Sequence, residues 1–369
     1  MSLVLDHLAA HRDRLGLGRH GADGRLSAVW LTPRFRASSH TVALVFGAGG
    51  AAPVLVAKVP RLPDAPAALA REAANIERLA GARLAGVTGI PELVAFERFR
   101  GWPILVQTAL DGRAWDRARV RQDPDAAAAA GVAWVTGLQR ATRASAPAGP
   151  EDFDRLAVGP LAVLRAAAGD DGEIARLVDR TLALAAPLRS APLPLAMEHG
   201  DFSAPNVMRL RDGGLGVVDW ELAEPRGWPV CDAFFWLTYV AFCRAGRPAA
   251  ADPVAAWTPA FWGPAPWGRP HVLGAAEAMG IERAWLTPLL ALTWARYLAG
   301  IVLRLGDTAG GGAAVDGATV AWLAAHRYCQ LWRAAVDGAG ALDWAGGPAT
   351  HGRRPPAPVK ERSRWLAWR

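Results

Sequence analysis

Lysine is almost absent from this sequence, because only Lys58 and Lys360 are lysines among 41 Lys and Arg residues. Cysteine is also scarce, and Cys231, Cys243 and Cys329 form no C-x-x-C pair. An odd number of isolated cysteines in apolar segments argues against a disulfide framework and against a cysteine zinc site. We therefore expect all three cysteines to lie in a hydrophobic core.

Two further absences concern secretion and membranes. The first residues, MSLVLDHLAAHRDRLG, lack the basic-then-apolar order of a secretory signal. The apolar stretch Val230–Cys243 is too short to cross a bilayer and contains Asp232. These features predict a cytoplasmic protein without a transmembrane segment.

Positive charge is concentrated at one end of the chain. Residues 352–369 hold six basic residues against the single acid Glu361, so this segment supplies +5 of the formal net charge of +7. The high isoelectric point therefore gives no general case for nucleic-acid binding. We expect residues 351–369 to form a disordered, Pro-rich basic tail, a candidate for contact with an anionic surface or a partner.

The apolar pattern changes near residue 110. Short β-branched runs predict strands over 26–33, 41–46, 53–60, 92–99 and 103–110, with one helix over 64–81 that Asp64 caps. Beyond this point, Ala/Leu-rich periodicity predicts helices over 126–143, 172–189, 284–305 and 319–336. The sequence thus predicts an α+β protein with a small β-rich lobe (1–109) and a larger helical lobe (110–350), joined near residues 107–112.

One Gly-rich segment fits a known fingerprint loosely. GAGGAA, residues 47–52, matches the G-x-G-x-x-A pattern of dinucleotide-binding proteins. That motif requires a helix directly afterwards to hold pyrophosphate, whereas a strand is predicted here. A hairpin turn is the better interpretation.

The segment MEHGDFSAPNVMRLRDGGLGVVDWE, residues 197–221, carries the most chemical information. The turn DGG between two short apolar runs predicts a β-hairpin, which brings Asn206 and Asp219 at its two ends together. Neighbouring oxygen-bearing side chains are what Mg²⁺ needs. Asp201, in the loop before Asn206, would lie near that metal and is placed to accept a proton from a hydroxyl nucleophile.

Two alternatives concern the same segment. Asp and Asn are common turn formers, so either half of the pattern alone favours a purely structural role. A hydrolytic triad of His199, Asp201 and Cys231 fits poorly, because nothing places the cysteine near the other two residues or activates it.

The pattern HGDFSAPN followed by VVDWE resembles the catalytic and metal-binding signature of the aminoglycoside phosphotransferase and choline kinase-like superfamily, whose fold is similar to that of protein kinases. This resemblance implies that Asp201 is the catalytic base, that Asn206 and Asp219 are Mg²⁺ ligands, and that His199 supports the loop. It implies for Asp232 a structural role in bracing that loop, although the spacing near Arg226 is about one residue longer than usual.

The lone lysine of the N-terminal lobe fits the same resemblance. In kinase-like folds a lysine on the third strand holds the α- and β-phosphates and is itself held by a glutamate on the next helix. Lys58 lies on the third predicted strand. At 100° per residue, Glu72 falls on the apolar stripe of the predicted helix, where an ionised carboxylate is costly unless it is paired, whereas Glu77 points away. Lys58 is its natural partner.

Other nucleotide contacts are expected on two segments. The loop RFRASSH, residues 34–40, stands where protein kinases carry a glycine-rich phosphate loop, but it has no glycine. Ser38 and Ser39 would offer donors to phosphate there, with an ordinary turn as the equal alternative. Gln107 to Leu110, including Ala109, would pass the adenine by backbone hydrogen bonds.

Together these features predict an ATP- and Mg²⁺-dependent kinase acting on a hydroxyl of a small molecule such as a sugar, an amino alcohol or an aminoglycoside. No acidic cluster of the kind a polycationic aminoglycoside requires is evident. The Trp-rich segment 257–270 is expected to fill core rather than to cover the acceptor site. Two alternatives remain, namely a non-catalytic kinase-like module that binds nucleotide or a partner, and a docking protein whose basic tail is the functional part.

Overall fold

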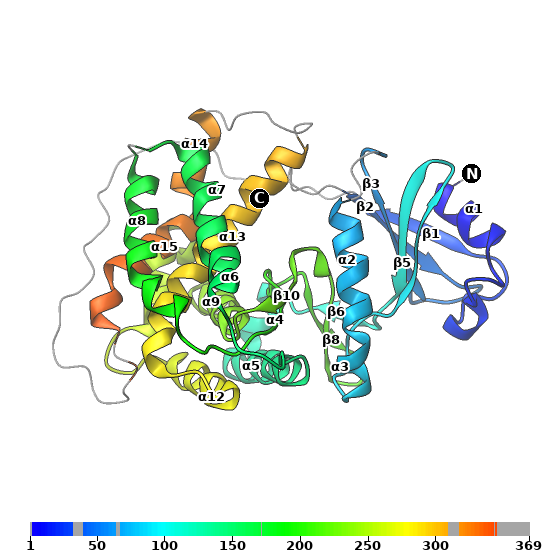
Figure 1. Cartoon of the computed structure of the whole chain (residues 1–369). Coiled ribbons are helices and arrows are strands. Elements are labelled where there is room, and N and C mark those ends of the chain that lie inside the picture. Colours follow the sequence, from blue (N-terminus) through cyan, green and yellow to red (C-terminus); the bar gives the residue numbers. More distant parts are fainter. Residues whose placement is uncertain are drawn as a thin grey trace.

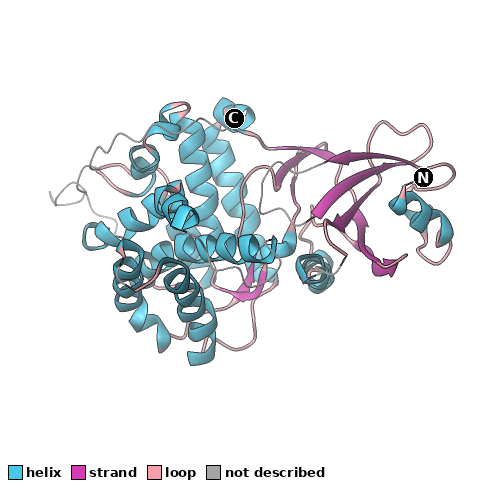
Figure 2. Cartoon of the chain, turned by 90° about the horizontal axis from the view of Figure 1, so that it is seen from above, coloured by secondary structure: helices cyan, strands magenta, loops and turns pink. Residues whose placement is uncertain are grey.

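The computed structural model describes residues 2–31, 40–63, 67–170, 172–308, 317–342 and 344. The chain forms two parts, a β-sheet with few helices and a larger helical part (Figures 1 and 2). The predicted tail 351–369, the capping residue Asp64 and the serines Ser38 and Ser39 lie outside the described residues.

The sheet of the smaller part is antiparallel, with five strands in the order β1-β2-β3-β5-β4. Its strands match the predicted ones: β1 Ser27–Leu31, β2 His40–Phe46, β3 Leu55–Pro60, β4 Leu93–Phe99 and β5 Trp102–Thr108. The middle strand β3 is almost wholly buried, and its Lys58 lies opposite Val42 of β2 and Leu105 of β5. Lys58 is therefore fixed in the middle of the sheet rather than at an edge.

Helices cover both faces of this sheet (Figure 1). Strand residues alternate between faces: Ala57 and Val59 belong to the core under α1 (Leu3–Ala10), whereas Leu105 packs with α2 (Ala67–Arg78). Lys58, between the first two, points to the α2 face. The prediction of a single helix was wrong, because α1 and the short α3 (Ala80–Leu84) are also present.

The larger part is mostly helical and its core is rich in tryptophan. Trp236, Trp257, Trp294 and Trp332 are fully buried, as are the three cysteines, which confirms the core role expected for the cysteines; Trp262 and Trp267 of segment 257–270 are partly buried and pack against the same core. Its helices are α4 Arg117–Gln122, α5 Pro124–Ala141, α6 Pro150–Phe153, α7 Gly159–Ala168, α8 Glu173–Ala185, α9 Cys231–Ala245, α10 Pro248–Ala251, α11 Pro253–Phe261, α12 Arg269–Met279, α13 Leu286–Thr308, α14 Gly317–Ala325 and α15 Arg327–Asp337.

Two of these helices depart from the sequence prediction. The helix expected over 319–336 is divided into α14 and α15 at His326, whose extended backbone ends the first helix and whose ring nitrogen accepts a hydrogen bond from the Tyr328 N–H at 3.4 Å. The segment Arg283–Leu305, which includes most of α13, is long and apolar enough to span a membrane, but 72% of its apolar window is buried inside the protein.

Short strands connect the two parts. β6 (Gly112–Ala114), which follows the last strand of the large sheet, pairs with β8 (Val207–Leu210), and β8 pairs with β9 (Leu215–Val217). The predicted hairpin is confirmed: a hydrogen bond of 3.0 Å from the Val218 N–H to the Asn206 carbonyl holds its two ends together. A second ribbon pairs β7 (Ala196–Glu198) with β10 (Glu224–Gly227).

Candidate active site

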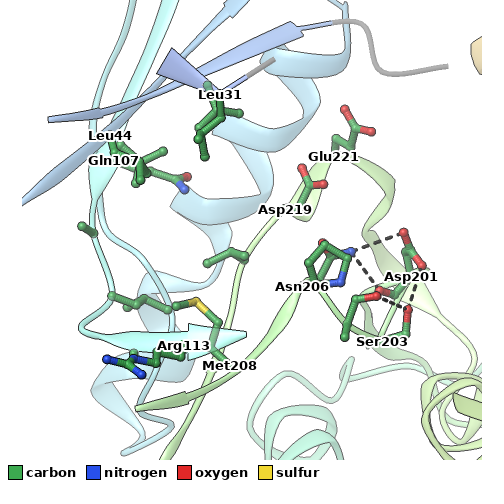
Figure 3. A pocket seen from close by; sticks show the side chains of 18 of the residues that line it. Leu31, Leu44, Gln107, Arg113, Asp201, Ser203, Asn206, Met208, Asp219 and Glu221 are labelled. Carbon is green, nitrogen blue, oxygen red and sulfur yellow. Dashed lines mark hydrogen bonds between the residues drawn. The ribbon is translucent and has the colours of Figure 1, made fainter. Parts of the chain in front are cut away.

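One cavity of about 1220 Å³ lies between the sheet and the helical part. Its volume exceeds the roughly 300–1,000 Å³ typical of a pocket for one small molecule, so it has room for two ligands. Figure 3 shows Leu31, Leu44 and Gln107 on one side, with Asn206, Asp201 and Ser203 across from them. Asp219 and Glu221 lie above Asn206 in this view.

Lys58 is the centre of a buried ionic cluster. Its ammonium nitrogen lies 2.7 Å from both carboxylate oxygens of Glu72 and 2.7 Å from Oδ1 of Asp219. Glu72 is completely buried on the sheet-facing side of α2, whereas Glu77 is exposed, as helical geometry predicts. Burial alone would lower the pKa of Lys58, but the two carboxylates outweigh burial and raise it. The lysine is therefore a permanent cation that joins the two parts of the molecule.

Asp219 faces the cavity from a strained turn. It follows the hairpin with φ of 70°, in the left-handed region that non-glycine residues rarely adopt. Burial would raise the pKa of its carboxyl, but the cations nearby, Lys58 first, hold that pKa at about 2. Asp219 is thus ionised at neutral pH, as a ligand of a hard cation must be.

His199 holds the loop that carries Asp201. Its Nδ1 accepts a hydrogen bond from the Asp201 N–H at 3.2 Å, so its Nε2 carries the proton and donates to the Val218 carbonyl at 3.0 Å. Burial lowers the pKa of His199 to about 4, which keeps the ring neutral. The ring also packs edge-on against Trp220. His199 therefore links the loop to the end of the hairpin and does not face the cavity.

Asp232, at the start of α9, also supports the loop that carries Asp201. Its two oxygens accept hydrogen bonds from the His199 N–H at 2.7 Å and the Gly200 N–H at 3.0 Å. Gly200 has φ of 82°, and a Cβ there would lie 2.8 Å from the Leu222 carbonyl oxygen, so only glycine fits. This geometry is the bracing that the sequence pattern predicts for Asp232.

Asp201 lies at the cavity wall, where hydrogen bonds fix its carboxylate while leaving it open to the cavity. The Asn206 side-chain amide donates to its Oδ2 at 3.3 Å and to its carbonyl at 3.1 Å, and the Ser203 hydroxyl donates to Oδ1 at 3.5 Å. Burial raises the pKa of Asp201 to about 7, although the charge of Arg304 opposes this shift. A carboxylate with a pKa near 7 is suited to general-base chemistry at neutral pH.

Two residues near Asp219 were not predicted as part of this site. Ligand atoms of His40, Asp219 and Glu221 all lie within 4.8 Å of one another, a spacing that would suit a metal ion. Burial lowers the pKa of His40 to about 4, so its ring is neutral. The DWE motif places Glu221 two residues after Asp219, whereas His40 lies on β2, about 180 positions away, and no sequence signal links it to them.

The residues expected to contact adenine line the other end of the cavity. Gln107 is almost fully buried, and its side-chain oxygen has no hydrogen-bond partner among the described residues. The N–H of Ala109 donates to the Val54 carbonyl at 3.0 Å and is therefore already used. The N–H of Thr108 likewise donates to the Glu92 carbonyl at 2.9 Å, so neither of these two N–H groups is available to a base.

Helices α13 and α15 complete the wall near Asp201. Tyr297, Ile301 and Arg304 line the cavity from α13, and His326, Arg327 and Tyr328 line it from the start of α15. The sequence analysis missed these residues, although the spacing i, i+4, i+7 on α13 marks one helical face. No residue of the segment 257–270 is among those that line the cavity.

This arrangement of a sheet, a helical lobe and a cleft between them defines a class, the bilobal protein-kinase-like fold. The choline kinase LicA from Streptococcus pneumoniae matches with a TM-score of 0.50 and 10% identity, over 88% of this chain and 99% of that one. LicA in complex with AMP matches over 90% and 96%, also with a TM-score of 0.50 and 10% identity. An ethanolamine kinase from Plasmodium vivax gives 0.46 and 11%, over 84% and 83%.

The chain belongs to the phosphotransferase enzyme family, APH, whose family model matches residues 34–267, more than half of its length. No curated protein sequence matches the chain. Because the identities to the solved structures are low, those structures establish the fold alone. Both comparisons confirm the family resemblance and the fold class predicted from the sequence.

Proposed function

We propose that this protein is a kinase that transfers the γ-phosphoryl group of ATP, with Mg²⁺, to a hydroxyl group of a small molecule. The observation that carries the proposal is the ionic cluster of Lys58, Glu72 and Asp219 at the wall of a cavity that also contains the hydrogen-bonded pair Asp201 and Asn206. The cavity therefore brings together a cation to bind phosphates, oxygen atoms to bind a metal ion and a carboxylate to act as the base.

The end of the cavity near β5 suits the base of the nucleotide. Apolar side chains of Leu31, Leu44 and Val56 line it, and the unpartnered oxygen of Gln107 is placed to accept a hydrogen bond from an amino group such as that of adenine. The structure of LicA in complex with AMP, which has the same fold, supports nucleotide binding. Lys58 would then hold the phosphates.

The oxygen donors around Asp219 fit Mg²⁺. Asp219 is ionised, and the amide of Asn206 lies at the other end of the same hairpin. These two residues would hold the ion, with the Glu221 carboxylate close by. The ion, when bound, would neutralise charge on the transferred phosphoryl group.

Asp201 would orient the acceptor and take its proton. The acceptor oxygen forms a bond to the γ-phosphorus, the bond from that phosphorus to the β,γ-bridging oxygen breaks, and ADP leaves with that oxygen. The hydroxyl proton passes to the Asp201 carboxylate. Because such transfers depend mostly on placement and charge, the hydrogen bonds that fix Asp201 matter as much as its basicity.

A non-catalytic nucleotide-binding module is the alternative, and Asp201 argues against it. A module that only binds nucleotide has no need of a buried carboxylate whose pKa is raised to about 7 beside the phosphate end. An ATP-dependent enzyme of this kind is expected in the cytoplasm, and that location stays part of the proposal.

The test compares Asp201→Asn with the matched control Asp212→Asn, which lies in the exposed hairpin turn and keeps its backbone hydrogen bond. Mg·ATP binding is measured by calorimetry, and phosphorylation of a panel of hydroxylated metabolites is measured by mass spectrometry. Asp201→Asn should bind Mg·ATP and lose turnover, while the control keeps both. Wild-type turnover in Asp201→Asn would exclude the proposed base, and absence of Mg·ATP binding by the wild-type protein would refute the proposed function.

A further inference from the structure

The wall of the cavity beside Asp201 is where an acceptor must lie, because its hydroxyl has to reach that carboxylate. This wall, here called the acceptor wall, consists of Tyr297, Ile301 and Arg304 from α13 and His326, Arg327 and Tyr328 from the start of α15. Burial raises the pKa of both Asp201 and Tyr297; the charge of Arg304 opposes the first shift, and the charge of Asp201 adds to the second. The chemistry of the acceptor wall therefore restricts the acceptor.

Carboxylates at the cavity are already in use. Among the described residues that line the cavity, four are acidic, and each contacts a donor: Asp111 with Arg211 at 2.8 Å, Asp219 with Lys58 at 2.7 Å, Glu221 with Arg304 at 3.5 Å, and Asp201 with the Asn206 amide at 3.3 Å. An amine or ammonium on the acceptor would share a carboxylate with the donor already there, and Lys and Arg side chains outnumber the carboxylates of this lining by seven to four. The cavity is a poor site for a cationic acceptor.

Positive charge, in contrast, is available on the acceptor wall. Arg327 is exposed, forms no ion pair with a described residue, and holds its guanidinium over the rings of Tyr328 at 5.6 Å and Phe242 at 5.9 Å. Its backbone is fixed because His326 ends one helix and caps the next. Arg304, 13% exposed, adds positive charge to the same wall, with its guanidinium 3.5 Å from Glu221. Planar guanidinium groups fixed in this way bind carboxylates and phosphates through paired hydrogen bonds.

The remaining groups of the acceptor wall are uncharged. Burial lowers the pKa of His326 to about 4, so its ring is neutral at pH 7. Tyr297 and Tyr328 pack edge to face with their ring centroids 4.9 Å apart and present apolar surface beside the arginines. A molecule with an aliphatic or ring-shaped body can pack there while one end meets an arginine.

We propose that the acceptor is a small hydroxylated molecule that carries an anionic group, a carboxylate or a phosphate, which Arg327 and Arg304 bind while its hydroxyl lies at Asp201. This proposal rests on the proposed kinase function and narrows its substrate class. It disfavours the amino alcohols and aminoglycosides that the sequence left open.

Matched acceptors test the proposal. Within each of two sets the probes share a scaffold and differ in charge: glucuronate and glucose 6-phosphate against glucose and glucosamine, and glycerate and glycerol 3-phosphate against glycerol and serinol. We expect phosphorylation of anionic members, with kcat/KM at least about tenfold above the neutral and cationic members. Comparing kcat/KM between the carboxylate and the phosphate probes then shows which of the two anionic groups the protein prefers.

Arginine variants connect the preference to the acceptor wall. Arg327→Gln should raise KM for the anionic acceptor by about 10- to 100-fold, with KM for ATP changed less than about twofold, and Arg327→Lys should recover part of the loss. The control is Arg333→Gln, also on α15, whose guanidinium pairs with Glu173 at 2.6 Å outside the cavity. It should leave both constants unchanged.

Three results would overturn the proposal. One is preference for glucosamine or serinol; another is a rise of KM for ATP alone in Arg327→Gln, which would assign the arginine to the nucleotide. The third is that neutral or cationic probes are phosphorylated while no anionic probe is, in which case the substrate class is wrong and the kinase function stands. Failure to bind Mg·ATP would instead refute the kinase function itself.

Discussion

Replacing Lys58 by methionine should reveal how the ionic cluster supports the fold. Methionine has a similar length but no charge, so Glu72 would keep its place, completely buried, without the ammonium group 2.7 Å from each of its oxygens. Removing one partner of a buried ion pair typically costs about 3–5 kcal/mol, because the other charge remains without compensation. The cost depends on pH, since Glu72 can escape it by taking up a proton.

The pH range follows from Glu72 itself. Burial raises its pKa from 4.5 to about 7 even though Lys58 lowers it, so in Lys58→Met the value must be higher still. A shift of the Glu72 pKa from 4.5 to about 7 corresponds to roughly 3 kcal/mol, which agrees with the typical cost of removing one partner of a buried ion pair. Because the folded-state pKa is raised, Lys58→Met keeps its stability below about pH 4.5 and loses it progressively from there up to the folded-state pKa, which lies above 7.

The assay is urea unfolding of Lys58→Met and of the double variant Lys58→Met/Glu72→Gln between pH 5 and 8.5. The difference in unfolding free energy between the two should be small at pH 5 and should reach about 3 kcal/mol above pH 8, while both variants lack kinase activity. Lys58→Arg keeps a cation beside Glu72 and should remove most of this pH dependence. A difference that does not change with pH would refute the reasoning.

Three further changes have defined outcomes. If Asp201 is the base, its pKa of about 7 predicts that kcat/KM falls about tenfold per unit below pH 7, and a flat profile from pH 5.5 to 8 would contradict that role. Gly131→Ala should destabilise the protein by about 1–3 kcal/mol or more, because a Cβ would lie 2.1 Å from Nε1 of Trp236; an unchanged melting temperature would show that the helices separate easily. Asp232→Asn can accept only one of its two backbone hydrogen bonds, so urea unfolding should show a loss of about 1–3 kcal/mol together with reduced turnover, and wild-type values for both would remove its bracing role.

Much of the fold follows from local patterns in the sequence. The alternating strands and the hairpin between Asn206 and Asp219 depend on neighbours in the chain, and those predictions are confirmed. The helix α1 was missed because its polar His7 is buried against Phe99, with ring centroids 5.2 Å apart, which no amphipathic pattern indicates. The break at His326 was missed for a similar reason, because a histidine cap gives only a weak signal compared with glycine or proline.

In the candidate site, too, some contacts could be predicted from the sequence and others could not. Helical geometry was sufficient to select Glu72 over Glu77 as the partner of Lys58 that the family resemblance implies, since both residues of the pair lie on regular elements whose faces are fixed by burial. The contact between Glu221 and Arg304, and the approach of His40 to both carboxylates, join segments that meet only when the two lobes pack together. Residue type could not predict these contacts, because nothing in the local sequence determines which helix of the larger lobe faces the cleft.

The scarcity of lysine makes the protein unusually simple to label. Arginine supplies nearly all its positive charge and does not react with electrophiles that modify amines, and Lys58 is the single lysine of the whole sequence apart from Lys360. Its raised pKa keeps it protonated, so a freely diffusing reagent should modify it slowly. A nucleotide analogue that carries such an electrophile should instead react at one position, and one peptide mass would then report occupancy of the cleft.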